Sequence, residues 1–173
     1  MKTVCYLRKL EQADLPKVFP LYTDPAVREF LGGPVSVEVA EQRASDLLAD
    51  GMTWAIIGSC DDDFAGTVTL HRHHDGVSTE MSYSLLQEHM GKGYATVALQ
   101  LMLTHAFVEL GLPAVVSETQ AANIRSTRLL ERIGMQPRER LMRFGVEQII
   151  YTIHALSRPP CIDRAGQVHL PQY

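Results

Sequence analysis

The sequence has no long hydrophobic run. Its uninterrupted apolar stretches are only a few residues long, far short of the ~20 residues that a membrane-spanning helix needs. The first residues also lack the pattern of a secretory signal, because their short apolar stretch is soon broken by Arg8 and Lys9. We therefore expect no membrane partner and a cytoplasmic location.

Cysteine is scarce. Cys5, Cys60 and Cys161 are widely separated, odd in number, and form no closely spaced pair. This usage does not fit a disulfide framework or a cysteine-based zinc site, and it is typical of a reducing compartment.

An excess of positive charge is missing too. The chain has 16 Lys and Arg against 20 Asp and Glu, for a net charge of −4. Proteins that bind nucleic acid through its phosphates are usually basic, so we expect no direct nucleic-acid binding. With 173 residues, 46% hydrophobic and 21% charged, the composition is that of one soluble globular domain.

Hydrophobic periodicity, turn residues and helix caps predict an α/β fold with a mixed sheet. The expected strands cover 3–8, 53–59, 64–71, 77–86, 115–119, 136–144 and 148–156. The expected helices cover 14–22, a short piece from 24, 36–48, 93–110 and 123–133. We predict one domain over residues 1–156 and a C-terminal tail over 157–173.

The strand expected at 77–86 alternates clearly. One face is largely apolar and includes Met81, Tyr83 and Leu85, whereas the other face carries Ser78, Glu80, Ser82 and Ser84. Four polar groups on one face predict that this face lines a cleft or water rather than the core.

The segment Met90 to Thr96 lies between this strand and the long helix that follows. Its glycines let backbone N–H groups approach a ligand, and the start of a helix favours an anion such as a pyrophosphate. Lys92 could add charge and Thr96 a hydroxyl. The alternative is a tight turn that needs glycine only for its shape. The spacing matches neither the Walker A motif nor GxGxxG.

Met90 to Ala95, MGKGYA, resembles the Q/R-x-x-G-x-G/A signature of the GNAT N-acetyltransferase superfamily. The resemblance covers roughly residues 3 to 156 in order. Within this superfamily, the sequence is similar to the branch that contains the ribosomal-protein N-terminal alanine and serine acetyltransferases. Five further segments carry this similarity: 24–28, 31–36, 80–85, 123–126 and 130–135.

This resemblance implies a GNAT domain with about six to seven mostly antiparallel strands and about four helices. Its sheet would be splayed at the coenzyme site, between the strands at 77–86 and 115–119. Acetyl-CoA would give its acetyl group directly to a primary amine. The implied coenzyme contacts come from Leu85 beside the thioester, the loop residues Met90, Gly91, Lys92, Gly93, Tyr94, Ala95 and Thr96, Asn123 on the pantetheine arm, and Arg128 near the phosphates.

The reaction needs two proton transfers. Glu80 matches the family's acidic position and is the expected general base, with a salt-bridged or surface glutamate as the alternative. Ser126 matches a serine proposed to protonate the leaving thiolate, with a partner in helix capping as the alternative. Many members use a tyrosine for the second transfer, but that position here is Leu130.

Several interpretations stay open at this point. Without that tyrosine, a non-catalytic acyl-CoA-binding module is the alternative to an enzyme. The acceptor could be a protein N-terminus, a small amine or an amine-bearing antibiotic, bound by residues 23–36 and the last hairpin. A homodimer is possible. His71 and His73 share a strand face, but we expect no metal site, and we expect Trp54 in the core.

Overall fold

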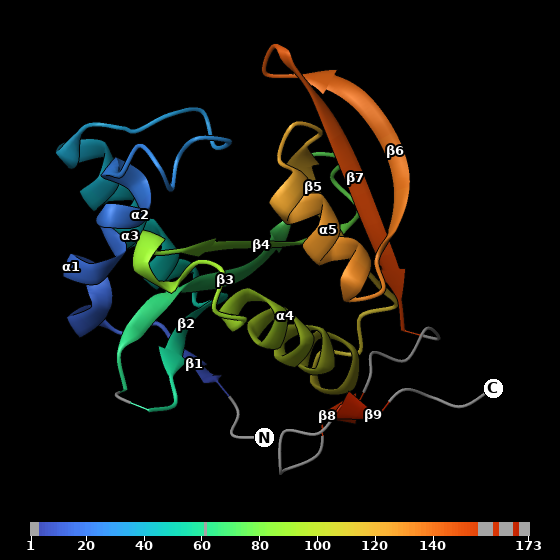
Figure 1. Ribbon diagram of the computed structural model, residues 1–173, viewed down its shortest axis with the longest axis horizontal. Helices are drawn as coiled ribbons and strands as arrows, with labels where there is room; N and C mark the ends of the chain where they lie inside the picture. Colours follow the sequence, from blue (N-terminus) through green and yellow to red (C-terminus); the bar gives the residue numbers. More distant parts are fainter. Residues whose placement is uncertain (1–3, 61, 156–160, 163–167, 170–173) are drawn as a thin grey trace.

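The computed structural model describes residues 4–60, 62–155, 161–162 and 168–169. Its centre is a seven-stranded sheet in the order β1-β2-β3-β4-β5-β7-β6 (Figure 1). The strands are β1 (Cys5–Lys9), β2 (Thr53–Gly58), β3 (Phe64–Arg72), β4 (Thr79–Leu85), β5 (Ala114–Gln120), β6 (Gln136–Arg143) and β7 (Val146–His154). A separate two-stranded pair joins β8 (Cys161–Ile162) to β9 (Val168–His169).

The helices cover the two faces of the sheet. They are α1 (Leu15–Val18), α2 (Pro20–Thr23), α3 (Val37–Asp50), α4 (Tyr94–Thr104) and α5 (Ile124–Arg132), with short helical turns η1 (Gln12–Asp14), η2 (Gln87–His89) and η3 (His105–Glu109). The helices α1 to α3 pack on β2 and β3 through a core that includes Val18, Leu21 and Phe64. The helices α4 and α5 pack on the other face around Met81, Leu99 and Leu130.

This architecture confirms the predicted α/β class and the mostly antiparallel sheet. Trp54 is buried in the core as expected, with only 7% of its surface exposed. Cys5 is also buried, and burial raises the pKa of its thiol to about 12, so this thiol stays protonated at neutral pH. Among the described residues, no helix is long and apolar enough to cross a membrane. The predicted tail lies largely outside the described residues.

Most strand and helix ends shift by one or two residues, and three of the expected helices differ more substantially. The helix expected at 14–22 is broken between Val18 and Pro20, because proline has no N–H to continue the backbone ladder. The helix expected from residue 24 is a turn in which the Asp24 carboxylate accepts the N–H of Ala26 at 2.7 Å. The long helix expected to reach residue 110 ends at Thr104 and continues as the wider turn η3.

The sheet opens between β4 and β5, as the resemblance implied. These two strands run parallel but are paired at one position, Glu80 with Val116, and separate toward Leu85 and Gln120. Beside this paired position, hydrogen bonds between side chains and backbone groups connect the two strands. The Ser117 hydroxyl donates to the Met81 carbonyl at 2.6 Å, and the Glu118 N–H donates to Glu80 Oε1 at 3.4 Å.

Gly66 provides a test of how tightly β3 packs on β4. A Cβ at Gly66 would lie 2.1 Å from the Ser84 carbonyl oxygen, so Gly66→Ala forces the strands apart. We expect a loss of about 2 kcal/mol or more in the free energy of unfolding, measured by urea titration. Gly111→Ala is the control, because its positive φ costs about 1 kcal/mol but nothing lies within 4 Å of its Cβ. Equal losses of unfolding free energy in the two variants would contradict the close contact between Gly66 and Ser84.

Candidate active site

A cavity of about 470 Å³ lies where β4 and β5 separate. Its lining comes from five segments: 81–85 at the end of β4, 90–96 except Lys92, 117–119 of β5, Asn123 with most of α5, and 26–31 except Arg28 from the turn after α2. The cavity therefore joins the predicted coenzyme loop, the polar face of β4 and part of the segment expected to hold the acceptor.

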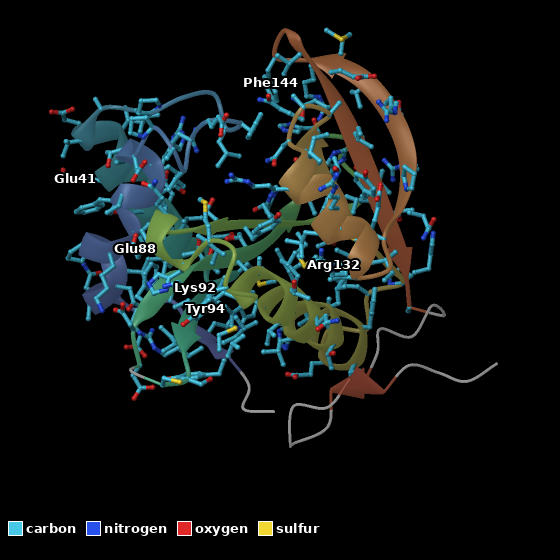
Figure 2. The ribbon with its side chains drawn as sticks, in the orientation of Figure 1. Glu41, Glu88, Lys92, Tyr94, Arg132 and Phe144 are labelled. Carbon is cyan, nitrogen blue, oxygen red and sulfur yellow. The ribbon has the colours of Figure 1, made fainter. Side chains whose placement is uncertain are left out.

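The loop before α4 has the geometry of an anion cradle. Gly91 has φ +74° and Gly93 has φ +87°, and nothing lies within 4 Å of a Cβ built at either position. Gly93 is also the N-cap of the 11-residue helix α4, whose first N–H groups have no partner within the helix. Lys92 and Tyr94 stand at this loop in Figure 2. Tyr94 lines the cavity, whereas Lys92 is not among the lining residues.

The start of α5 brings Asn123 and Ser126 together. The Asn123 side-chain oxygen accepts the backbone N–H of Ser126 at 3.1 Å and so caps the helix. The Ser126 hydroxyl is not used in this cap; it accepts a hydrogen bond from the Tyr83 hydroxyl at 3.1 Å. Burial raises the pKa of Tyr83, so its phenol stays protonated. Both side chains line the cavity.

Tyr83 escaped prediction because it sits on the apolar face of β4, where a tyrosine is expected to be a core residue. Only the packing of α5 against β4 shows that its hydroxyl reaches Ser126. Leu130, at the position of the family's usual tyrosine, lines the same cavity and is otherwise buried.

Arginine side chains of α5 supply positive charge to the cavity. Arg128, predicted near the coenzyme phosphates, lines it together with Arg125 and Arg132. These arginines are spaced by three and four residues, which places them on one side of a helix. That spacing could have identified Arg125 and Arg132 from the sequence.

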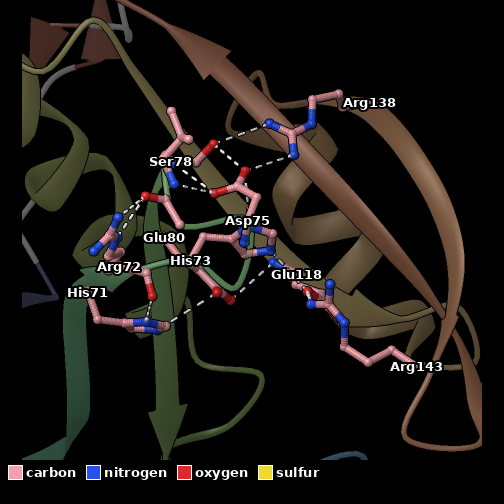
Figure 3. A network of polar contacts seen from close by, with 11 residues as sticks. His71, Arg72, His73, Asp75, Ser78, Glu80, Glu118, Arg138 and Arg143 are labelled. Carbon is pink, nitrogen blue, oxygen red and sulfur yellow. Dashed lines mark hydrogen bonds and ion pairs between the residues drawn. The ribbon is translucent and has the colours of Figure 1, made fainter.

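Glu80 lies beneath the cavity rather than on its surface. It is 7% exposed, its Oε1 accepts the Glu118 N–H, and its Oε2 is 3.9 Å from His71 Nε2 (Figure 3). Burial raises the pKa of Glu80, while the nearby His71 and His73 act in the opposite direction. Glu80 is not among the cavity-lining residues, but its neighbour Glu118 is.

Glu118 belongs to a polar network that the sequence did not reveal. Its Oε2 is 3.1 Å from His73 Nε2 and 2.5 Å from Arg143 Nη1. His73 also meets Asp75 in the turn between β3 and β4 (Figure 3). His71 and His73, which share a strand face in the sequence prediction, therefore each lie close to a carboxylate, Glu80 of β4 and Glu118 of β5 respectively. Among the described residues, no group of three or more His, Cys, Asp or Glu is arranged to hold a metal ion.

The fold and the sequence both match known acetyltransferases. Residues 5–136 match the family model described as an acetyltransferase (GNAT) domain. An uncharacterized N-acetyltransferase, p20, of Bacillus licheniformis is 27% identical over 145 residues, which cover 79% of this chain and 81% of that protein.

Solved structures share the same fold. A GNAT-family acetyltransferase from Bacillus anthracis aligns with a TM-score of 0.79 and 20% identity, over 90% of this chain and 98% of that one. Spermidine N-acetyltransferase from Vibrio cholerae, solved with CoA and spermine, aligns with a TM-score of 0.74 and 20% identity, over 88% of this chain and 96% of that one. The chain therefore belongs to the GNAT family and is an N-acetyltransferase.

Proposed function

We propose that this enzyme transfers the acetyl group of acetyl-CoA directly to a primary amine, with both substrates bound in the cavity between β4 and β5. The observation that carries this proposal is one cavity that joins a glycine-lined helix start to Glu118, whose backbone N–H donates to the buried Glu80 carboxylate behind it. GNAT enzymes use acetyl-CoA, and the glycine cradle, the arginines of α5 and the cavity fit its phosphates and pantetheine arm.

For the coenzyme, we propose the contacts expected from the sequence, with two additions. Backbone N–H groups of the loop, including those of Gly91 and Gly93, would hold the pyrophosphate. The side-chain N–H₂ of Asn123 would meet the pantetheine arm, since its oxygen is used in the helix cap. A backbone N–H near Leu85 would stabilise the charge that develops on the thioester oxygen. Arg125 and Arg132 join Arg128 in neutralising phosphate charge.

The chemistry needs two protons to leave the acceptor. Its ammonium first loses one proton, its nitrogen then bonds to the acetyl carbon as the C–S bond breaks, and a second proton leaves the nitrogen. One proton ends on the CoA sulfur and the other is released to water. We propose Glu80 as the base for the first transfer, with a water molecule carrying the proton from the cavity to it, and Ser126 as the donor to sulfur. The bond from Tyr83 orients the Ser126 hydroxyl, leaving its own proton to face the cavity.

The acceptor is a primary amine in this proposal. The solved spermidine acetyltransferase supports a small amine, whereas the sequence branch favours a protein N-terminus. A cytoplasmic location, a homodimer and a tail over 157–173 remain predictions. The apolar Leu130, in place of the family's usual tyrosine, is the observation that favours a binding module without turnover.

Turnover separates an enzyme from a binding module. We expect acetyl-CoA to raise the melting temperature in a concentration-dependent way, because a ligand that binds only the folded state stabilises it. We also expect release of free CoA thiol with at least one amine in a panel of spermidine, n-butylamine and a peptide with a free N-terminus. Stabilisation without thiol release would support the binding module. No stabilisation at millimolar acetyl-CoA would contradict both.

The coenzyme loop can be tested by two substitutions. Gly93→Val places a branched side chain at φ +87° in the cradle, so we expect acetyl-CoA binding to weaken about 10-fold or more. Lys92→Ala leaves the backbone intact and should change the dissociation constant by less than about 3-fold. Calorimetric titration with acetyl-CoA measures both, with melting temperatures as the folding control. A larger effect of Lys92→Ala would mean that side-chain charge holds the pyrophosphate.

The proton transfers predict distinct pH–rate profiles. Only ionised Glu80 can accept a proton, so the parent rate should fall as the pH drops below the raised pKa of Glu80. Glu80→Gln should lower turnover by roughly 10²–10⁴-fold near neutral pH, and the loss should shrink as the acceptor amine deprotonates at higher pH. Ser126→Ala should lower turnover with little rescue at high pH. Identical profiles for the parent and Glu80→Gln would show that Glu80 only supports β5.

A further inference from the structure

His73 is the buried centre of a chain of polar contacts that links Asp75 in a surface turn to Glu118 (Figure 3), which lines the cavity. It is 2% exposed, and both of its ring nitrogens have partners. The Asp75 backbone N–H donates to its Nδ1 at 3.2 Å, the Asp75 carboxylate lies 3.2 Å from the same nitrogen, and its Nε2 is 3.1 Å from Glu118 Oε2. A buried imidazole bonded at both nitrogens is fixed in orientation.

Asp75 is itself held firmly. Its carboxylate accepts the backbone N–H groups of Val77 and Ser78 at 2.9 and 2.8 Å, and the Ser78 hydroxyl at 2.7 Å. These bonds hold the pKa of Asp75 well below its usual range, so it is ionised at neutral pH. Arg138 of β6 adds a contact at 3.4 Å. The turn therefore gives His73 a fixed, negatively charged support.

Glu118 is anchored through only one of its oxygens. Both His73 and Arg143 meet Oε2, and no described residue forms a hydrogen bond with Oε1. Arg143 belongs to the end of β6, so the last hairpin also takes part in holding this side chain. The Glu118 side chain is 8% exposed and lines the cavity. A carboxylate held in this way has one oxygen left for a ligand.

The charge distribution of the cavity indicates which ligand that is. The phosphates of a coenzyme suit the arginines on α5 and the glycine loop, and they would be repelled by Glu118. An ammonium would donate a charge-assisted hydrogen bond to a partly desolvated carboxylate. Glu29, from the segment 26–31, adds a second acidic residue to the cavity lining. Glu80 lies directly below, with its Oε1 on the Glu118 N–H.

We propose that Glu118 binds the ammonium of the acceptor, and that His73 and Arg143 are positioning residues that hold its carboxylate toward the cavity. This inference rests on the proposed function and narrows the acceptor to amines that arrive protonated. It also divides the roles of the two glutamates: Glu118 binds the ammonium, and Glu80, which lies behind the cavity lining, takes the proton.

Binding of spermidine to the CoA-saturated enzyme tests Glu118 without requiring turnover. By calorimetry, we expect Glu118→Gln to weaken spermidine binding about 10-fold or more, because a neutral amide replaces the charge, while CoA binding is unchanged. Glu147→Gln is the matched control, since Glu147 also pairs with an arginine of β6, Arg140, at 3.3 Å but does not line the cavity. Equal affinity for the parent and Glu118→Gln, or no binding to the parent, would overturn the proposal.

His73 is tested by two replacements. His73→Phe removes both hydrogen bonds and should weaken spermidine binding nearly as much as Glu118→Gln does. In His73→Gln an amide can still donate to Glu118, so part of the affinity should return. His74→Gln, at the neighbouring exposed position, should leave the affinity for spermidine unchanged. If His73 were merely structural, the melting temperature would fall without this graded loss of affinity.

The two proposals fail in different ways. If no panel amine releases thiol from acetyl-CoA, the proposed function is wrong, yet spermidine binding still decides the role of Glu118. If the parent turns over an amine and Glu118→Gln binds spermidine as the parent does, only the ammonium site is wrong.

Discussion

The separation of β4 from β5 is the constraint on which the rest of the site depends. A parallel pair needs a crossover, and here the chain between the two strands contains the coenzyme loop and α4. The helix α4 packs on Met81 and the neighbouring core, and the two strands meet at one position and then diverge. Separated strands leave backbone groups without ladder partners. The side chains of Ser117 and Glu80 meet two such groups, so the opening is stabilised by the residues beside it.

The opening also separates opposite charges within one cavity. The arginines of α5 and the start of α4 favour an anion, whereas Glu118 and Glu29 favour a cation. The proposed reaction has the same distribution of charge, because an anionic coenzyme would meet an amine that arrives as a cation and reacts after it loses a proton. Keeping the two charged regions apart lets each substrate bind without neutralising the other's partners. The sulfur would then lie between them, where Ser126 and Tyr83 form their hydrogen bond.

Much of the fold could be predicted from local patterns, but the depth and partners of individual side chains could not. Alternation along 77–86 identified the polar face of β4, yet it did not show that Glu80 is buried while its neighbour Glu118 reaches the cavity. Glu118 and Arg143 come from two different strands, and His73 follows the end of a third, so their contact depends on how the strands are paired, which no local pattern records. Pro20 is a local signal for a helix break, but the apolar pattern on both sides of it predicts one continuous helix.

The segment that closes the cavity opposite α5 is supported by its own bonds rather than by the sheet. The Asp24 carboxylate accepts the Ala26 N–H, and Arg28 Nε donates to the Gly33 carbonyl at 2.9 Å. Residues between these bonds, such as Phe30 and Leu31, face the cavity without taking part in strand pairing. If this segment borders the acceptor, as proposed, its residues could be exchanged without disturbing the coenzyme half of the site. The range of acceptor amines would then evolve separately from the acetyl-transfer chemistry.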